Sequence, residues 1–308
     1  MFGRKIQLVS MVQGLLSSRS LHPKHLASVS LLRNFHVSAT EPETQFHEIK
    51  DANSGKVRRI AYKKLNGSRS HGLIYVPGFM SNMSGTKSAE LHLFCQKYGF
   101  PYVRYDPSGL GKSEGVKMTE TTMSLWLEDA TEMLLKMTDG AQIVIASSMG
   151  CWISSLIAQK HPEKFAAILM LGPAINFGER YENVLRGQLP PKVLKKFEAG
   201  EIVSLHAPDY GDFPLSMKVF EDMKQYNVTL EADNITMPCP VRIIHGVKDK
   251  DVPHMESLQL LKALQITDVQ LNYLKHAGHT LSDAASLEVM FDTILNLASY
   301  VNKKESHS

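Results

Sequence analysis

Cysteine is scarce in this chain: only Cys95, Cys151 and Cys239 are present, and no two of them form a CxxC pair. An odd number of scattered cysteines does not suit a disulfide framework, and no cluster has the spacing of a zinc site. Such cysteine usage is typical of a reducing compartment. We therefore predict no disulfide, no metal and no cofactor.

Long apolar runs and a basic excess are also missing. No stretch approaches the ~18 apolar residues of a membrane-spanning helix. Residues 1–40 hold five basic residues and no acidic one, while residues 41–308 hold 29 basic and 31 acidic residues. The overall charge of +3 thus hides a body with a net charge of −2, which gives no indication of nucleic-acid binding. With 43% hydrophobic residues, the chain can form one large domain with a sizeable core.

The N-terminal region has the composition of a mitochondrial presequence, because it is basic, rich in serine and almost free of acidic residues. Four apolar residues share one face at helical spacing: Ile6, Val9, Val12 and Leu16. The segment 33–38 resembles a two-step matrix cleavage signal, which places the mature terminus near Glu43. A secretory signal and a tail without function are the alternatives. We expect a transit peptide over 1–42, a catalytic domain over 43–308 and a location in the mitochondrial matrix.

Strand-like and helix-like segments alternate along the rest of the chain. Two strand-like segments, 44–50 and 57–65, flank turn residues that favour an antiparallel hairpin. Further strands are expected at 72–76, 101–106, 165–171, 241–245 and 269–274, and helices at 86–98, 119–137, 152–160 and 284–301. This alternation predicts an α/β fold with a doubly wound, mostly parallel sheet. The alternation fails over about 173–239, which is too long for a connection, so we expect a small helical cap there that covers the active site.

The segment 142–153 contains a β-branched run, a small-x-Ser-x-Gly sequence and the start of a helical pattern. Ala146, Ser148 and Gly150 occupy the small, serine and glycine positions. A strand, a sharp turn and a helix in this order are typical of a nucleophile elbow, which exposes a serine hydroxyl above the sheet. We predict Ser148 as a covalent nucleophile. An ordinary strand-to-helix connection with small packing residues is the structural alternative.

A serine nucleophile needs a base, and the base needs an acid to orient it. Sites in parallel sheets lie at the carboxyl ends of strands, in the chain order serine, acid, histidine. Asp249 follows the predicted strand 241–245, and His279 follows the predicted strand 269–274. We predict that His279 takes the proton of Ser148 and that Asp249 holds the imidazole and stabilises its charged form.

Neighbouring residues compete for these roles. Asp251 is the alternative to Asp249, which is favoured by its spacing from the Val-Pro pair that follows. His276 is interpreted as a support for its loop and His245 as a structural histidine at a strand end. Ser147 is expected to point along its strand.

Developing charge on a substrate oxygen requires preorganised donors. The backbone amides of Phe79 and Met149 are the predicted oxyanion hole: Phe79 follows the strand 72–76, and Met149 begins a helix. Gly78 allows the backbone to approach the substrate. Cys151 is interpreted as a packing residue of that helix, since a reactive thiol needs an exposed electropositive setting.

Two other features have alternative interpretations. The loop 109–113 ends in Lys-Ser but lacks the spacing of a P-loop, so we interpret it as a tight turn near the site. Basic residues of the cap are interpreted as a solvated face, with contact to an anionic substrate as the alternative: Arg180, Arg186, Lys192, Lys195 and Lys196. Apolar residues of the cap are interpreted as its core, with an acyl groove as the alternative: Leu185, Leu189, Val193, Leu194 and Phe197.

Together these motifs resemble the α/β-hydrolase superfamily over about 57–301, and within it a mitochondrial branch of palmitoyl-protein thioesterases and acyl-glucuronide esterases. The segments that carry this resemblance are 61–65, 77–81, 85–87, 147–150, 245–249, 275–276 and His279. Ala146 at the elbow and Cys151 after Gly150 depart from the pattern. The resemblance implies a triad of Ser148, Asp249 and His279 and the hydrolysis of acyl thioesters and esters in mitochondria.

We therefore expect a serine hydrolase whose substrates are S-acylated proteins or small acyl esters, including acyl glucuronides. An esterase or lipase for other substrates is the enzymatic alternative. A hydrolase fold kept only as a binding module is the alternative from another class. An aspartate nucleophile, as in haloalkane and epoxide hydrolases, is disfavoured because a serine stands at that position.

Overall fold

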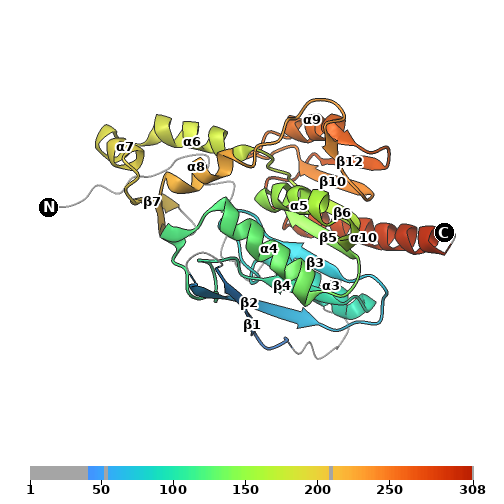
Figure 1. Ribbon diagram of the computed structural model, residues 1–308. Coiled ribbons are helices and arrows are strands. Elements are labelled where there is room, and N and C mark those ends of the chain that lie inside the picture. The colour runs from blue at the N-terminus through green and yellow to red at the C-terminus, as the bar shows by residue number, and fades with distance from the viewer. Residues whose placement is uncertain (1–40, 52–54, 208–210, 307–308) are drawn as a thin grey trace, which may run out of the picture.

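A computed structural model describes residues 41–51, 55–207 and 211–306 (Figure 1). Nearly all of the predicted presequence, residues 1–40, lies outside the described residues. Within the described part of the chain, none of the helices has the length and apolar character needed to cross a membrane.

The centre of the fold is an eight-stranded sheet with the order β1-β2-β4-β3-β5-β6-β10-β12. These strands are β1 (Gln45–Lys50), β2 (Val57–Leu65), β3 (Leu73–Val76), β4 (Tyr102–Tyr105), β5 (Gln142–Ser147), β6 (Phe165–Leu171), β10 (Val241–Gly246) and β12 (Val269–Leu274). The β1–β2 and β2–β4 pairs are antiparallel, and all other pairs in this sheet are parallel. The predicted doubly wound, mostly parallel sheet is therefore confirmed, and so is its N-terminal hairpin.

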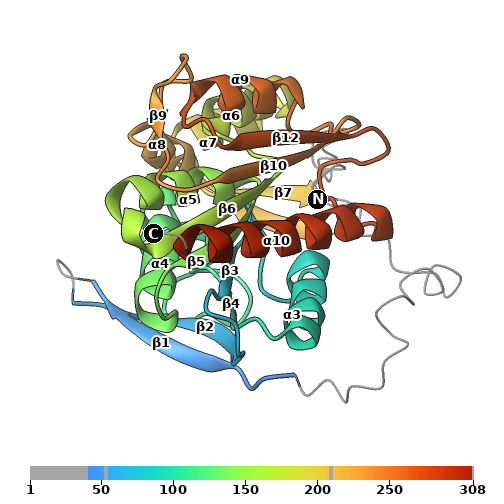
Figure 2. The same ribbon diagram turned by 90° about the vertical axis from the view of Figure 1, so that its right-hand side faces the viewer.

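Helices cover both faces of the sheet (Figures 1 and 2). One face carries α4 (Met123–Met137) and α5 (Met149–Lys160), and the other carries α3 (Thr86–Tyr98) and α10 (Ala284–Glu305). Each face has its own apolar core, one containing Trp126 and Trp152 and the other Phe94 and Ile294, all with at most 1% of their surface exposed. Burial of such large side chains contributes most of the stabilisation of each layer.

Local signals explain where these helices begin and end. The Thr122 hydroxyl accepts a hydrogen bond from the amide of Leu125 and caps α4. That helix begins at Met123 and not at the predicted residue 119, because the residues before the cap form a short 3₁₀ helix, η2 (Met118–Glu120). Asp283 caps α10 in the same way, and Gly99 ends α3 with a φ of 73°.

The segment 177–236, between β6 and β10, contains α6 (Phe177–Gln188), α7 (Pro191–Glu198), β7 (Val203–Ala207), β8 (Gly211–Leu215), α8 (Lys218–Lys224) and the short strand β9 (Ile235–Thr236). Figure 1 shows α6, α7 and α8 beyond one end of the sheet. Phe197 and Phe220 are fully buried within this segment. After it, α9 (Met255–Ala263) and the short strand β11 (Leu264–Gln265) lie between β10 and β12, and β11 pairs with β9.

Candidate active site

Ser148 lies in the sharp turn between β5 and α5, and its backbone is in an unusual conformation. Its φ is 53° and its ψ −120°, values that a residue with a side chain rarely adopts. The Ser148 amide donates to the carbonyl of Leu171 on the neighbouring strand β6, at 2.9 Å. A Cβ atom on Gly150 would lie 2.3 Å from the carbonyl oxygen of Val76, so α5 approaches the sheet this closely only with glycine there.

Ser148 is largely buried but lines a pocket. Only 8% of the Ser148 surface is exposed. The pocket that the serine lines has a volume of about 370 Å³, its opening to solvent included. Phe177, Arg180 and Tyr181 of α6 line the same pocket, so the cap contributes to the cover over the elbow.

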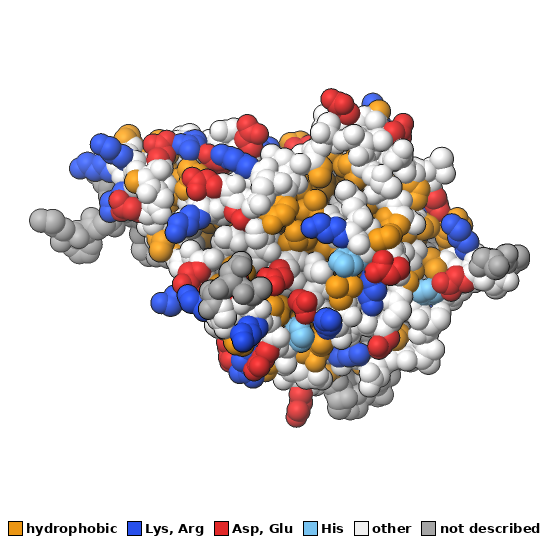
Figure 3. All heavy atoms as spheres, in the orientation of Figure 1, with side chains coloured by type: hydrophobic (Ala, Val, Ile, Leu, Met, Phe, Trp, Pro, Cys, Tyr) orange, Lys and Arg blue, Asp and Glu red, His pale blue; other side chains and the backbone are white. Residues whose placement is uncertain are grey.

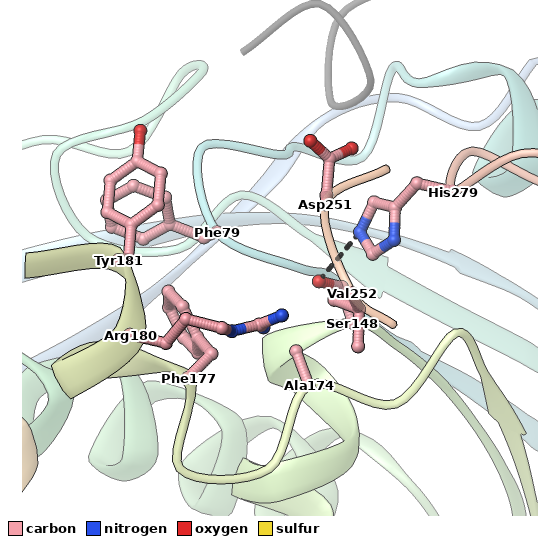
Figure 4. Close-up of a pocket in the computed structure, with 9 residues that line it drawn as sticks. All are labelled: Phe79, Ser148, Ala174, Phe177, Arg180, Tyr181, Asp251, Val252 and His279. Atoms are coloured by element: carbon pink, nitrogen blue, oxygen red, sulfur yellow. Dashed lines mark hydrogen bonds between the residues drawn. The ribbon is translucent and has the colours of Figure 1, made fainter. Parts of the chain in front are cut away.

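Ser148, His279 and Asp249 form one chain of hydrogen bonds, of which Figure 4 shows the bond between Ser148 and His279. Nε2 of His279 lies 3.0 Å from Oγ of Ser148, and Nδ1 of His279 lies 2.7 Å from Oδ2 of Asp249. A carboxylate oxygen can only accept, so Nδ1 of His279 carries the proton and Nε2 is free to accept from the serine. The structure thus brings together three residues from the loops after β5, β10 and β12, in the order expected from the sequence.

Asp249 is held by donors on both of its oxygens. The amides of Asp251 and Val252 donate to Oδ1 at 2.9 and 2.8 Å, and two histidines contact Oδ2. Burial alone would raise the pKa of this carboxyl, but the hydrogen bonds from His245 and His279 reverse the effect and hold the pKa well below its usual range. Asp249 therefore stays ionised beside His279.

His245 contacts this acid directly, which the sequence interpretation as a purely structural histidine missed. Its Nε2 lies 2.9 Å from Oδ2 of Asp249 and 3.2 Å from the carbonyl of Val252, both acceptors, so Nε2 is the donor. Its Nδ1 accepts from the hydroxyl of Ser257 at 2.6 Å. Only its position four residues before Asp249, at the end of a strand, signals this role in the sequence. His276, by contrast, is half-exposed and contacts Asp283 at 3.2 Å.

The pocket has a mainly apolar wall. Its lining residues are Phe79, Ser148, Ala174, Phe177, Arg180, Tyr181, Asp251, Val252 and His279. The rings of Phe79, Phe177 and Tyr181 pack against one another, with centroid distances of 5.8 to 6.4 Å. The apolar cap residues considered for an acyl groove are absent from this lining, and Leu185, Leu189 and Phe197 are buried in the core. The lining from the cap comes from the first turns of α6.

The two predicted oxyanion donors both lie close to the elbow. Met149 is the first residue of α5, where helix amides have no partner within the helix. Phe79 lines the pocket, and the residue before it approaches the elbow closely: a Cβ atom on Gly78 would lie 3.0 Å from Cβ of Ser148. A side chain at position 78 would therefore crowd Ser148.

Lys87 is a further residue near the site, within the segment 85–87, and the sequence analysis assigned no role to it. Its ammonium group donates a hydrogen bond to the carbonyl of Thr280, the residue after His279. Burial lowers the pKa of Lys87 to about 8, while Cys151 and Asp249 act in the opposite direction. The contact ties α3 to the loop that carries the histidine.

The remaining residues considered in the sequence analysis have contacts that indicate packing, a turn or ion pairing. Burial raises the pKa of the Cys151 thiol to about 12, which suits packing and not reactivity. The loop 109–113 is a tight turn around Asp106, whose carboxylate accepts from the amide of Lys112 at 2.7 Å. Two basic cap residues pair with acids, Arg186 with Glu182 and Lys196 with Glu201, and Figure 3 shows both charge signs mixed over this end of the molecule.

One group of side chains in the described part of the chain has the spacing of a metal site. Ligand atoms of Asp249, Asp251 and His279 lie within 4.8 Å of one another. Asp249 and His279 are, however, hydrogen-bonded to each other, with the proton of Nδ1 between them. This pairing suits proton transfer better than metal coordination, for which the imidazole nitrogen would have to lose that proton.

Comparison with known proteins agrees with this architecture. Residues 72–211 match the family model described as serine aminopeptidase, S33. The chain is 32% identical over 248 residues to the bovine protein named palmitoyl-protein thioesterase ABHD10, mitochondrial, with coverage of 77% of this chain and 76% of the relative. The human ABHD10 protein is 31% identical over 240 residues, with the same coverage.

A solved structure shows the same fold. Mouse α/β-hydrolase domain-containing protein 10 superposes with a TM-score of 0.70 and 27% sequence identity, covering 83% of this chain and 99% of the mouse chain. The sequence relatives, the family model and the shared fold all agree. The chain therefore belongs to the ABHD10 family of α/β hydrolases.

Proposed function

We propose that this protein is a serine hydrolase that cleaves acyl thioesters and acyl esters through an acyl-Ser148 intermediate. The observation that carries the proposal is the unbroken hydrogen-bond chain from Ser148 through His279 to Asp249. Ser148, at one end of this hydrogen-bond chain, lines a pocket with an apolar wall. A serine hydroxyl is a weak nucleophile, and an adjacent oriented base is what activates it.

In the first half of the reaction, Oγ of Ser148 attacks the substrate carbonyl carbon while Nε2 of His279 takes the hydroxyl proton. The amides of Phe79 and Met149 donate to the oxyanion that forms. Each such donor typically supplies about 2.7–4 kcal/mol of transition-state stabilisation. His279 then gives its proton to the departing sulfur or oxygen, and the C–S or C–O bond breaks.

In the second half, water replaces the leaving group beside His279. The imidazole takes a proton from this water, which attacks the acyl carbon, and it returns the proton to Oγ of Ser148 as the carboxylic acid leaves. Asp249 stays ionised throughout and stabilises the transient imidazolium. Its lowered pKa suits that role.

The substrates we propose are S-palmitoyl-cysteine residues in proteins and acyl esters, including acyl glucuronides. The names of the relatives support thioesters, and the aromatic pocket wall formed by Phe79 and Phe177 suits an acyl chain. A carboxylesterase or lipase of another substrate class would use the same machinery, and turnover of matched thioester and oxygen-ester substrates separates these possibilities. We predict no nucleic-acid partner.

We further propose a location in the mitochondrial matrix, with the segment 177–236 acting as a cap over the site. The relatives are named mitochondrial, and the composition of the N-terminal region supports import. We propose cleavage near Glu43. Glu41 forms ion pairs with Lys63 and with the buried Arg104, and a cleavage just before Glu41 would retain them.

A fluorophosphonate probe tests the proposal, since it reacts only with an activated serine. The wild-type protein should be labelled, with the adduct on Ser148 by peptide mass spectrometry, and Ser148→Ala should not be labelled. Ser147→Ala is the matched control, because its hydroxyl is outside the hydrogen-bond chain, and it should be labelled. A folded wild-type protein that neither reacts nor cleaves any acyl substrate would instead indicate a binding module.

A further inference from the structure

The carboxyl group of Asp251 is buried in the pocket without a partner. Only 6% of this residue is exposed, and neither carboxyl oxygen has a hydrogen-bond partner within the described part of the chain. It lines the same pocket as Ser148 and His279 (Figure 4). A buried polar group without a hydrogen bond is costly, so such a group in a pocket points to a ligand that completes it.

Asp251 lies close to His279 in this pocket. A carboxyl oxygen of Asp251 lies within 4.8 Å of a ring nitrogen of His279. In the proposed reaction His279 returns its proton to the leaving atom, so the leaving group must lie beside the imidazole. The carboxyl of Asp251 lines the same pocket close to this imidazole, so it lies within reach of a leaving group bound there.

In the described part of the chain, Arg180 and His279 are charged or titratable neighbours of Asp251, but neither forms a hydrogen bond with its carboxyl group. Arg180 lies in the same pocket but forms its ion pair with Glu256, at 3.2 Å. Burial raises the pKa of Asp251 to about 7 and the charge of Asp249 acts in the same direction, while His279 and Arg180 oppose it. In either protonation state the carboxyl keeps an oxygen that accepts a hydrogen bond.

We propose that Asp251 is a specificity-determining residue that accepts a hydrogen bond from the leaving group of the substrate. The enzyme then favours acyl thioesters and esters whose leaving group carries an N–H or O–H donor close to the scissile bond. A cysteine within a peptide has such a donor in its backbone amide, whereas a simple alkyl thiol has none. This inference rests on the proposed hydrolase function and adds a preference within it.

Two thioesters that differ only in this donor test the inference. S-octanoyl-N-acetylcysteamine has an N–H group in its leaving thiol, and the octanoyl thioester of 2-acetoxyethanethiol has an ester oxygen at the same place. For the full-length wild-type protein we expect a kcat/KM ratio of about tenfold or more in favour of the amide, because a site built for a donor rejects an analogue without it.

Three variants distinguish the effect of the Asp251 side chain from an effect of the loop that carries it. Asp251→Ala should lower the ratio to near one, and Asp251→Asn, which keeps an acceptor oxygen, should retain part of the preference. Lys250→Ala is the matched control, since this exposed neighbour is in the same loop, and it should retain the wild-type ratio.

The outcomes distinguish this inference from the proposed function. Wild-type protein that is labelled by fluorophosphonate but shows a ratio near one would overturn the role of Asp251 alone. The same holds if labelled Asp251→Ala keeps the wild-type ratio. Absence of both labelling and turnover in the wild-type protein would overturn the proposed function, and this inference with it.

Discussion

The Nε2 atom of His245 lies 2.9 Å from Oδ2 of Asp249, the same carboxylate oxygen that contacts His279. His245 is fully buried, and its other nitrogen is fixed by the hydroxyl of Ser257. Asp249 thus accepts hydrogen bonds from two histidines, His245 and His279. This arrangement restricts the rotation of the carboxylate and so the orientation of the His279 imidazole, the proposed base.

Replacing this second histidine should reduce catalysis more than binding. We expect His245→Ala to lower kcat by about 10- to 100-fold, the loss that corresponds to one hydrogen bond to a charged group. KM should change little, because His245 does not line the pocket. Steady-state kinetics at constant pH measures both. His276→Ala is the control, since this half-exposed histidine is outside the chain; equal losses in the two variants would contradict the assignment.

The two candidate acids should differ sharply when each is made neutral. Asp249→Asn should lower kcat by about 10⁴-fold, because an amide in that place favours the wrong imidazole tautomer. Asp251→Asn should keep most of its activity on a substrate without a leaving-group donor. If Asp249→Asn remains active while Asp251→Asn is inactive on such a substrate, the acid has been assigned to the wrong residue.

Asp251 should make the stability of the protein depend on pH. Its folded pKa of about 7 exceeds the unfolded value near 4, so the folded state binds more protons between these values. Its contribution to stability is then full below about pH 4 and is lost as the pH rises toward 7. Between pH 5 and pH 8, the unfolding free energy of Asp251→Asn should rise relative to wild type by about 2–3 kcal/mol.

Denaturant titrations of both proteins at pH 5 and pH 8 check this difference. Comparing the two pH values removes the effect of the new amide, which is the same at each. A difference that does not change with pH, or that changes in the opposite direction, would mean that this carboxyl is not destabilised by burial.

Glycine at position 150 should be required for the elbow. We expect Gly150→Ala to lower the free energy of unfolding by about 1–3 kcal/mol, since the new methyl group would meet the backbone of Val76 and Pro77. Gly187→Ala is the control, because nothing lies within 4 Å of its added Cβ in α6. That change should be neutral or slightly stabilising in the same denaturant titration.

The sequence predicts the sheet and the position of the three proposed triad residues at its edge, because both follow from local rules. Strand and helix periodicity give the alternating order, and the carboxyl ends of parallel strands meet at one edge. Ser148, Asp249 and His279 each follow a strand in that sheet, and their hydrogen-bond distances agree with the predicted proximity. Their catalytic roles remain a prediction until they are tested.

Other features depend on contacts between distant segments and have no local signal. The sequence predicts a cap over the active site, but not that Phe177, Arg180 and Tyr181 are its residues beside Ser148. The contact of Lys87 with Thr280 joins residues far apart in the chain. The unpaired carboxyl of Asp251 and the donor role of His245 emerge only when the neighbours of each side chain are known.

The most direct test of the central claim is to trap the covalent intermediate. The full-length protein is mixed with an activated palmitoyl thioester, quenched in acid within milliseconds and examined by intact and peptide mass spectrometry. We predict an added palmitoyl group on Ser148, which disappears with time in the wild-type protein and never forms in Ser148→Ala. Rapid turnover without any acyl adduct, or an adduct on Cys151 or Lys87 that turns over in its place, would contradict the account.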